Sequence, residues 1–509
     1  MYVLPAARNA PDTARLKRLS AYGTEPAGRP LLRLGAVAAL YTLVQLLLVL
    51  PGTGLGWDET VYVSQVDRNA PTAFFSAPRA RGISYLVAPV TAATSSTTAL
   101  RVFLALLSGA GLLAALWVWR KLLPVSVLAW AGALFGTLWI SLFYGPQAMP
   151  NLWCAFGSLA AVGCFLRVAR SPADRAARVG LGICVAVVAL MRPPDAVWLV
   201  LALGGAALLV RAWRRPAVLR PVLVALTAGA LFGAAPWILE AYASYGGLLS
   251  RLHRASDIQG GMGWNVAIGD HVRSLQGRSL CRPCALPWEE PHTGLWWFAL
   301  PLLAASGISV AVRAGRKDAA VLPAVTAVVL ALPYLFLMGY AAPRFLLPGY
   351  ALLALPVAEC VRRAFAARRR HGRRPLVLVL LPALLLGSHL FVQYQVLGTA
   401  VQNNHRMTAQ LTEGADQLQR LGLRPPCVLT GAYAVPMSHY AGCTARQSHG
   451  HDTSISTAGL GEFARQGRPM AVSVGRGHAT PSWARDWPSA RLHLMPGYRV
   501  YVSPGARPR

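Results

Sequence analysis

Long apolar runs, separated by short polar or arginine-containing breaks, dominate the first 393 residues of the chain. A helix needs about 20 apolar residues to cross the hydrocarbon core of a membrane. We therefore expect about eleven membrane-spanning helices, at residues 32–51, 99–119, 124–143, 149–167, 179–192, 195–211, 220–240, 294–312, 319–340, 343–361 and 375–393. The fifth span is short, and we separate it from the sixth because the prolines that follow Arg192 interrupt helical geometry.

The pattern changes abruptly after residue 393. Residues 399–421 predict a helix, and short apolar runs between glycine and proline breaks predict strands at 427–430, 470–474 and 498–502. The expected fold is therefore mainly α: a polytopic membrane helical bundle at 32–393, followed by a small α/β domain at 394–509.

The positions of arginine and lysine predict the orientation of the bundle. If residues 1–31 are cytoplasmic, the other basic turns are cytoplasmic too, whereas the short opposite turns near 144–148, 193–194 and 341–342 contain no basic residue. These cytoplasmic turns carry Arg120, Lys121, Arg170, Arg175, Arg178, Arg214, Arg215, Arg313, Arg316, Lys317 and seven arginines between 362 and 374. The loops at 52–98 and 241–293 and the C-terminal domain are then extracytoplasmic. We expect an integral protein of a bacterial plasma membrane, without a cleavable signal peptide.

The composition supports this interpretation. Hydrophobic residues make up 55% of the 509 positions and charged residues only 13%, whereas a soluble domain has about 25% charged residues. The formal net charge of +30 comes from 49 basic and 19 acidic side chains. Since the basic residues lie in short loops between apolar runs, this charge indicates membrane topology, and we expect no nucleic-acid partner.

The eight cysteines divide according to the same topology. Cys154, Cys164, Cys184 and Cys360 lie in or at the ends of spans, where we expect buried apolar side chains. The other four lie in extracytoplasmic segments, which are oxidising, and four cysteines allow three pairings. We favour the pairs Cys427–Cys443 and Cys281–Cys284.

Two neighbouring acids, Asp58 and Glu59, follow the first span in the sequence Trp57–Tyr62. One acid could deprotonate a hydroxyl group, and both could bind a divalent cation. Alternatively, the two acids begin an interfacial helix, where the helix dipole favours them. The chain has no GK[ST] phosphate loop, GxGxxG turn or HExxH motif, so nucleotide-dependent chemistry has no support.

Further ionisable residues lie at the same expected membrane level. Such groups are costly near a membrane unless they pair or line a polar cavity. Asp195 could simply pair with Arg192, and Arg344 could extend to the interface. Their shared side of the membrane favours a cavity instead, with lining residues Tyr62, Arg192, Asp195 and Glu240 and with Arg79, Arg81 and Arg344 nearby.

These short motifs together resemble the GT-C superfamily of integral membrane glycosyltransferases, which includes protein mannosyltransferases and lipid A aminoarabinose transferases. The resemblance covers about residues 30–390 and rests on the first span with Gly56–Glu59 and Tyr62, Ser76–Arg79 through Ala88–Pro89, Arg192–Asp195, and Arg344–Pro348. The C-terminal domain resembles the appendages of bacterial members only in position and type. Many relatives have a His-Pro-Pro-Leu segment where this chain has Ala77-Pro78-Arg79, which leaves the donor sugar open.

The resemblance implies transfer of a sugar from a polyprenyl-phosphate donor to an acceptor hydroxyl on the extracytoplasmic face, usually with inversion. Asp58 would be the general base, and Glu59 would support it, orient the acceptor or help hold a cation. Arg344, with Arg79 or Arg81, would bind the lipid phosphate, for which guanidinium is well suited. The partners would be membrane lipids, the lipid-linked donor and an envelope glycan, lipid or protein acceptor.

No cofactor is certain from the sequence, although a divalent metal ion is compatible with the paired acids. The segment His449–Asp452 has side chains that could bind a metal, but a flexible polar turn is the favoured interpretation.

Two other functions remain as alternatives. A transporter or flippase of lipid-linked saccharides should show inverted repeats and charged residues at the membrane midplane, whereas here the acids lie near the outer surface and no repeat is evident. A non-catalytic envelope scaffold would tolerate replacement of Asp58.

Overall fold

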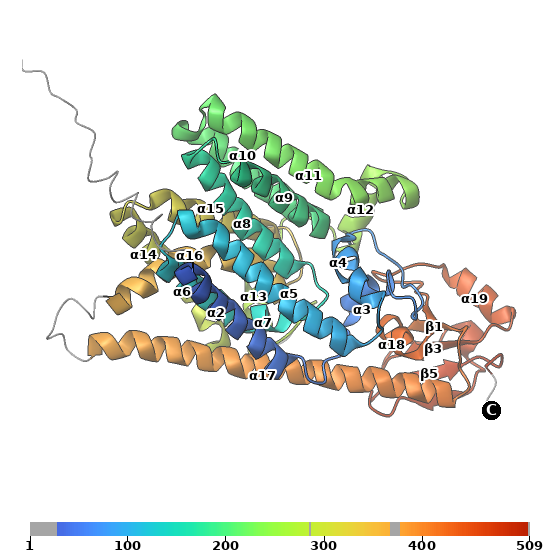
Figure 1. Cartoon of the computed structure of the whole chain (residues 1–509). Helices are drawn as coiled ribbons and strands as arrows, with labels where there is room; N and C mark the ends of the chain where they lie inside the picture. The colour runs from blue at the N-terminus through green and yellow to red at the C-terminus, as the bar shows by residue number, and fades with distance from the viewer. Residues whose placement is uncertain (1–27, 283, 285–286, 367–376, 507–509) are drawn as a thin grey trace, which may run out of the picture.

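The computed structural model describes residues 28–506, except for residues 283, 285–286 and 367–376. Most of the expected cytoplasmic segment 1–31 and the arginines between 368 and 374 therefore lie outside the described residues. All eleven predicted spans coincide with helices of one elongated bundle (Figure 1). These helices are α2 (Gly28–Val44) with η2 (Gln45–Val49), α5 (Thr97–Val118), α6 (Val125–Gly136), α7 (Trp139–Tyr144), α8 (Asn151–Arg170), α9 (Arg175–Met191), α10 (Pro193–Leu209), α11 (Pro216–Ser244), α14 (Leu295–Arg313), α15 (Lys317–Phe336), α16 (Leu347–Ala366) and α17 (Val377–Arg420).

Eight helices of the described chain are long and apolar enough to cross a membrane, which confirms a polytopic membrane protein. The remaining predicted spans are shorter. The third is divided into α6 and α7 at residues 137–138, and α9 and α10 have 17 residues each, separated at Arg192 as the prolines predicted. A total of eleven spans stays a prediction.

Small residues allow helices α9 and α11 to pack closely. A Cβ atom on Gly229 would collide with the carbonyl oxygen of Gly182, and one on Gly233 with the carbonyl oxygen of Ala186. Since lipid tails are as apolar as helix side chains, close backbone packing of this kind is a main source of helix association in membranes.

Helix α17 corrects one sequence-based expectation. We expected a span ending at 393 and a separate helix beginning at 399, but a single helix of 44 residues runs from the bundle into the C-terminal region (Figure 1). Its length is about 66 Å at 1.5 Å per residue. The polar residues after 393 mark a change of surroundings, and no proline interrupts the helix there.

The C-terminal region, residues 421–506 and called the tail below, is a small α/β unit, as predicted. Its five-stranded sheet has the order β2-β1-β3-β5-β4. Strand β1 pairs in parallel with β2 and β3, and β5 pairs antiparallel with β3 and β4. The elements are β1 (Val428–Gly431), α18 (Ala434–Ala441), β2 (Thr444–Ala445), α19 (Thr457–Arg465), β3 (Met470–Val474), β4 (Ser489–Arg491) and β5 (Arg499–Val502). Leu411 and Leu418 of α17 belong to its core, and a disulfide links Cys427, directly before β1, to Cys443, directly before β2.

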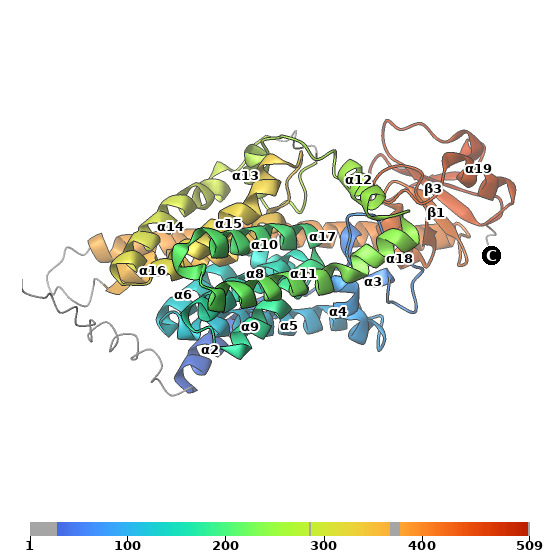
Figure 2. The same ribbon diagram turned by 90° about the horizontal axis from the view of Figure 1, so that it is seen from above.

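Two connecting loops contain further short helices, most of which lie at the end of the bundle that faces the tail (Figure 2). The first loop, residues 50–96, contains α3 (Trp57–Ser64) and α4 (Gly82–Thr91). The second loop, residues 245–294, contains α12 (Leu248–Ile258), α13 (Ile268–Ser274) and η5 (Pro291–Gly294). Four further single turns are η3 (Trp119–Lys121), η4 (Arg211–Trp213), η6 (Pro343–Leu346) and η8 (Ser482–Ala484).

Replacing Gly233 by valine should separate α9 from α11 and destabilise the protein by about 1–3 kcal/mol, the usual cost of overpacking. The matched control is Gly205→Val in α10, because a Cβ atom on Gly205 meets no other atom. Thermal unfolding in detergent measures both variants. Equal midpoints for the two would contradict the close α9–α11 contact.

Candidate active site

Helix α3 directs its two acids to different surroundings. It begins at Trp57, and the side chain of Glu59 accepts the backbone N–H of Gly56 at 3.0 Å, so that it caps the helix. Successive residues of a helix are about 100° apart around its axis. Asp58 and Glu59 therefore do not form a joint pair of acids, and each has its own partners.

Glu59 is buried and forms an ion pair with Arg101 of α5. Nη2 of Arg101 donates to Oε2 of Glu59 at 2.8 Å, and the backbone N–H of Ala148 donates to Oε1 at 2.7 Å. The same guanidinium donates to the carbonyl oxygens of Gly54 and Pro146. This network fixes α3 to α5 and to the turn before α8. Sequence reasoning missed Arg101, although an arginine at the start of an apolar span was a usable signal.

Asp58 lies between two arginines. Nη2 of Arg79 donates to its Oδ1 at 2.8 Å and Nη2 of Arg344 to its Oδ2 at 3.1 Å. The side chain of Asp58 is 36% exposed, whereas each arginine is only 9% exposed. Burial alone would raise the pKa of Asp58, but the positive charges of Arg79 and Arg344 outweigh burial and hold that pKa below its ordinary value. The site thus presents an ionised carboxylate between two cations.

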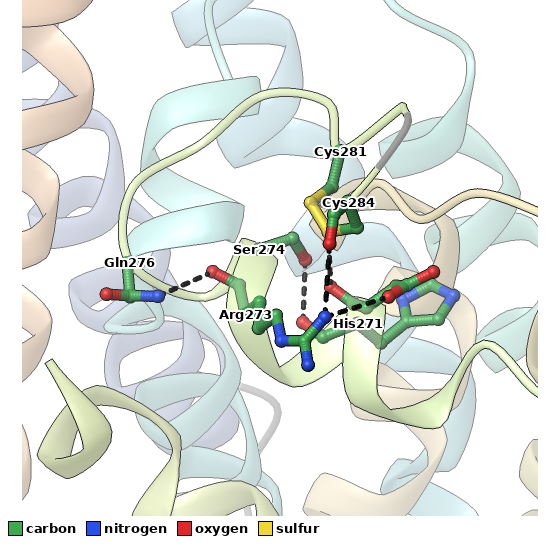
Figure 3. Close-up of a disulfide and its surroundings, with 7 residues drawn as sticks. His271, Arg273, Ser274, Gln276, Cys281 and Cys284 are labelled. Atoms are coloured by element: carbon green, nitrogen blue, oxygen red, sulfur yellow. Dashed lines mark hydrogen bonds and ion pairs between the residues drawn. A yellow bond between two sulfur atoms is a disulfide. The ribbon is translucent and has the colours of Figure 1, made fainter. Parts of the chain in front are cut away.

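The second loop helps to hold Arg344 in this position. The carbonyl oxygen of Ser279 accepts a hydrogen bond from Nη1 of Arg344 at 2.6 Å. Two residues later, Cys281 forms backbone hydrogen bonds with Ala341 and a disulfide with Cys284 (Figure 3), the same pairing that the sequence favoured. The Cys284 carbonyl oxygen accepts a hydrogen bond from Arg273 of α13. Cys281 and Cys284 are therefore held to Ala341, three residues before Arg344, and to Arg273 of α13.

The tail contributes an acid that sequence reasoning had placed in a polar turn. Asp452 is buried, and its carboxylate accepts hydrogen bonds from Nη1 of Arg79 and from the indole nitrogen of Trp57, both at 2.6 Å. Within the described residues, no three His, Cys, Asp or Glu side chains lie close enough to hold a metal ion.

Arg81 and Glu240 form a second charge cluster. Nε of Arg81 donates to Glu240 at 3.0 Å, and the buried Arg251, which the sequence did not single out, donates to the same acid at 2.9 Å. This cluster lies beside a cavity of about 300 Å³, which is also lined by Phe74, Tyr245, Arg254 and Arg446. Arg81 is thus not a partner of Asp58.

Arg192 and Asp195 form a third cluster at the start of α10. Nε of Arg192 lies 3.5 Å from Oδ2 of Asp195, and Tyr334 donates to the other oxygen. The Phe345 ring lies between Arg192 and Arg344, with guanidinium-to-centroid distances of 5.1 and 5.4 Å. The local pair that we considered as an alternative is therefore present, and an aromatic ring connects it to Arg344.

Tyr62 is buried beside the site, where its ring meets Phe75 edge to face at a centroid distance of 6.0 Å. Burial raises the pKa of Tyr62 to about 12, so the phenol stays neutral at physiological pH. The Phe75 ring in turn lies 4.0 Å from the guanidinium of Arg81, so the two rings connect Tyr62 to the Arg81 cluster.

Comparison with solved structures identifies the fold. The crystal structure of ArnT from Cupriavidus metallidurans bound to undecaprenyl phosphate matches with a TM-score of 0.66 and 13% identity, over 95% of this chain and 100% of that chain. The apo state of the same protein matches with a TM-score of 0.63 and 12% identity, over 97% and 100%. The chain therefore has the fold of these ArnT structures, in agreement with the fold that the resemblance of the short motifs implied. No family model and no curated protein matches the sequence.

The replacement Glu59→Gln should destabilise the protein by about 3–5 kcal/mol, because it leaves the buried Arg101 without a counterion. Asp486→Asn, which changes an exposed acid of the tail, should leave stability unchanged. Thermal unfolding of both variants in the same detergent measures the difference. A Glu59→Gln variant as stable as the wild type would show that the Glu59–Arg101 pair does not hold α3.

Proposed function

We propose that this protein transfers a sugar from a polyprenyl-phosphate donor to an acceptor hydroxyl on the extracytoplasmic face of the membrane. The observation that carries this proposal is the ionised, partly exposed Asp58 held between Arg79 and Arg344. This arrangement supports the proposal, because an ionised carboxylate, our candidate for the base, lies beside two groups of a type that binds phosphate well. The fold adds support, because it is the fold of an ArnT structure bound to undecaprenyl phosphate.

Asp58 acts as the general base of the proposed reaction. Its carboxylate takes the proton of the acceptor hydroxyl as the acceptor oxygen attacks the anomeric carbon. The bond from that carbon to the phosphate oxygen breaks, and its electron pair stays on the departing polyprenyl phosphate. Attack from the side opposite the phosphate inverts the anomeric configuration.

Arg344 and Arg79 stabilise the negative charge that grows on the leaving phosphate, which is where an enzyme gains most. Of the two candidates for assisting Arg344, we favour Arg79, because Arg81 is already paired with Glu240. Glu59 supports Asp58 indirectly through its pair with Arg101.

Donor binding and base strength are coupled in this arrangement. Without donor, both arginines stabilise the ionised form of Asp58 and so weaken it as a base. A lipid phosphate competes with Asp58 for the same guanidinium groups. When it binds, Asp58 loses part of this stabilisation and becomes a stronger base at the moment when the substrate is present.

The orientation follows from the basic turns. Two turns remote from Asp58 meet through ion pairs of Asp174 with Lys121 at 3.9 Å and with Arg167 at 2.8 Å. The positive-inside rule assigns this arginine-rich end to the cytoplasm, which leaves Asp58 and the tail outside.

Asp58→Asn should lower sugar transfer by about 10²- to 10⁴-fold, the usual contribution of a general base. The donor is first identified by mass spectrometry of lipid carriers from cells with and without the protein, and is then supplied to proteoliposomes. Asp67→Asn in the same loop is the matched control. Wild-type turnover by Asp58→Asn would refute the general-base role, and movement of the saccharide across the membrane without transfer would indicate a flippase.

Arg344→Ala should lower transfer by about 10²- to 10³-fold, since it removes a cation from the leaving phosphate. Arg68→Ala, an exposed arginine of the first loop, should leave transfer unchanged. Unchanged transfer and unchanged binding of undecaprenyl phosphate in Arg344→Ala would show that Arg344 does not bind the phosphate.

Acidification from pH 7.5 to about pH 5 should not reduce kcat/KM through Asp58, because kcat/KM reports the protonation state of the donor-free site. Its pKa is below the ordinary aspartate value, so the carboxylate stays ionised throughout this range and is protonated only at lower pH. The value of kcat/KM, measured in proteoliposomes across this pH range, tests this prediction. A loss of activity with a midpoint near pH 6.5 would point to a histidine as the base.

A further inference from the structure

The loop at residues 447–454 of the tail, called the tail loop below, has a fixed base. The backbone N–H of Ser454 donates to the carbonyl oxygen of Gln447 at 2.8 Å, and the Gln447 side chain donates to the carbonyl oxygen of Gly431 at 2.8 Å, at the end of β1. The loop is thus anchored to the sheet, and it projects from the sheet toward the first loop.

Asp452 differs from its neighbours in the tail loop. His449 and His451 are exposed, whereas Asp452 is only 3% exposed. A buried carboxylate is stabilised only when it is paired, because it loses its hydration. Both oxygens of Asp452 are used: one accepts from Arg79 and the other from Trp57. Asp452 therefore joins the tail to Trp57, which directly precedes Asp58, and to Arg79, which is paired with Asp58.

The second loop reinforces this placement. Nη1 of Arg282 lies 2.7 Å from Nε2 of His451, and Arg254 donates to the Thr453 carbonyl oxygen at 3.2 Å. The tail loop therefore contacts both connecting loops at the edge of the site.

The geometry of Arg79 explains what Asp452 can do. Nη1 of Arg79 donates to Asp452 and to Ser76, which leaves Nη2 for a single bond to Asp58. Without Asp452, the guanidinium could turn and bind Asp58 through two parallel hydrogen bonds, the arrangement that arginine and carboxylate favour. Asp58 would then be a weaker base and less accessible to an acceptor.

We propose that Asp452 is a positioning residue of the transfer site: it fixes the guanidinium of Arg79 so that Asp58 receives only one of its hydrogen bonds. The proposal rests on the function proposed above and extends it, because the tail then supplies part of the site. The charges alternate along the series Asp452, Arg79, Asp58 and Arg344, so the removal of Asp452 leaves an excess positive charge beside the base.

The test compares Asp452→Asn, Asp452→Glu and the control Asp486→Asn, an exposed acid of the tail, in full-length protein in proteoliposomes. We expect Asp452→Asn to lower kcat by about 10- to 100-fold, as small misplacements of catalytic groups do, with a smaller change in the KM of the donor. Asp452→Glu should recover part of the loss, and Asp486→Asn should match the wild type.

Two further measurements separate positioning from a general loss of folding. In an Arg79→Lys background, Asp452→Asn should add little to the loss, since both changes act through one contact. Hydrogen exchange of residues 76–81 should be faster in Asp452→Asn than in Asp486→Asn, while the Cys427–Cys443 disulfide and the unfolding temperature are retained.

A wild-type kcat in Asp452→Asn, or losses that simply add in the double variant, would overturn the positioning role and leave the proposed function intact. A wild-type protein that transfers no sugar from the identified donor would instead refute the proposed function. The exchange of residues 76–81 would still decide whether Asp452 fixes the Arg79 segment.

Discussion

The buried ion pair between Glu59 and Arg101 sets the direction of α3, and the geometry around Asp58 depends on it. Both side chains are almost fully buried, so separating them would leave a charge without solvent or partner. Glu59 is held against α5. Asp58 lies about 100° away around the axis of α3 and therefore faces a different, more exposed side of the helix. Asp58 can therefore remain partly exposed although it lies only nine residues after Val49, the end of the first membrane-spanning helix.

The charges of the site are balanced in the absence of any ligand. The negative charges of Asp58 and Asp452 offset the positive charges of Arg79 and Arg344. This balance allows four charged side chains to lie together at a largely buried position. An arriving phosphate would disturb this balance by recruiting the arginines. In our proposal, the same two cations that hold the base in its resting state stabilise the leaving group during transfer.

Four remote parts of the chain build the site: the first loop, the second loop with Ser279, the turn η6 with Arg344, and the tail loop. Their alignment requires that the tail keep a fixed position above the bundle. The continuous helix α17 provides this, because it runs along one side of the bundle and also supplies core residues to the tail (Figure 1). A flexible linker at residue 394 would not give Asp452 a fixed place beside Arg79.

The sequence by itself determined the helical bundle and the α/β tail. Hydropathy and helix-breaking residues act locally, and every membrane-spanning helix must match the same membrane thickness. It also singled out Asp58, Arg79 and Arg344, since acids and arginines stand out in an apolar chain. Only the tertiary structure decided which of these charges meet. It separated Arg81 from Asp58, paired Glu59 with Arg101 and placed Asp452 against Arg79, from which it is 373 residues distant in the sequence. Such pairings depend on the packing of distant segments and leave no periodic signal in the sequence.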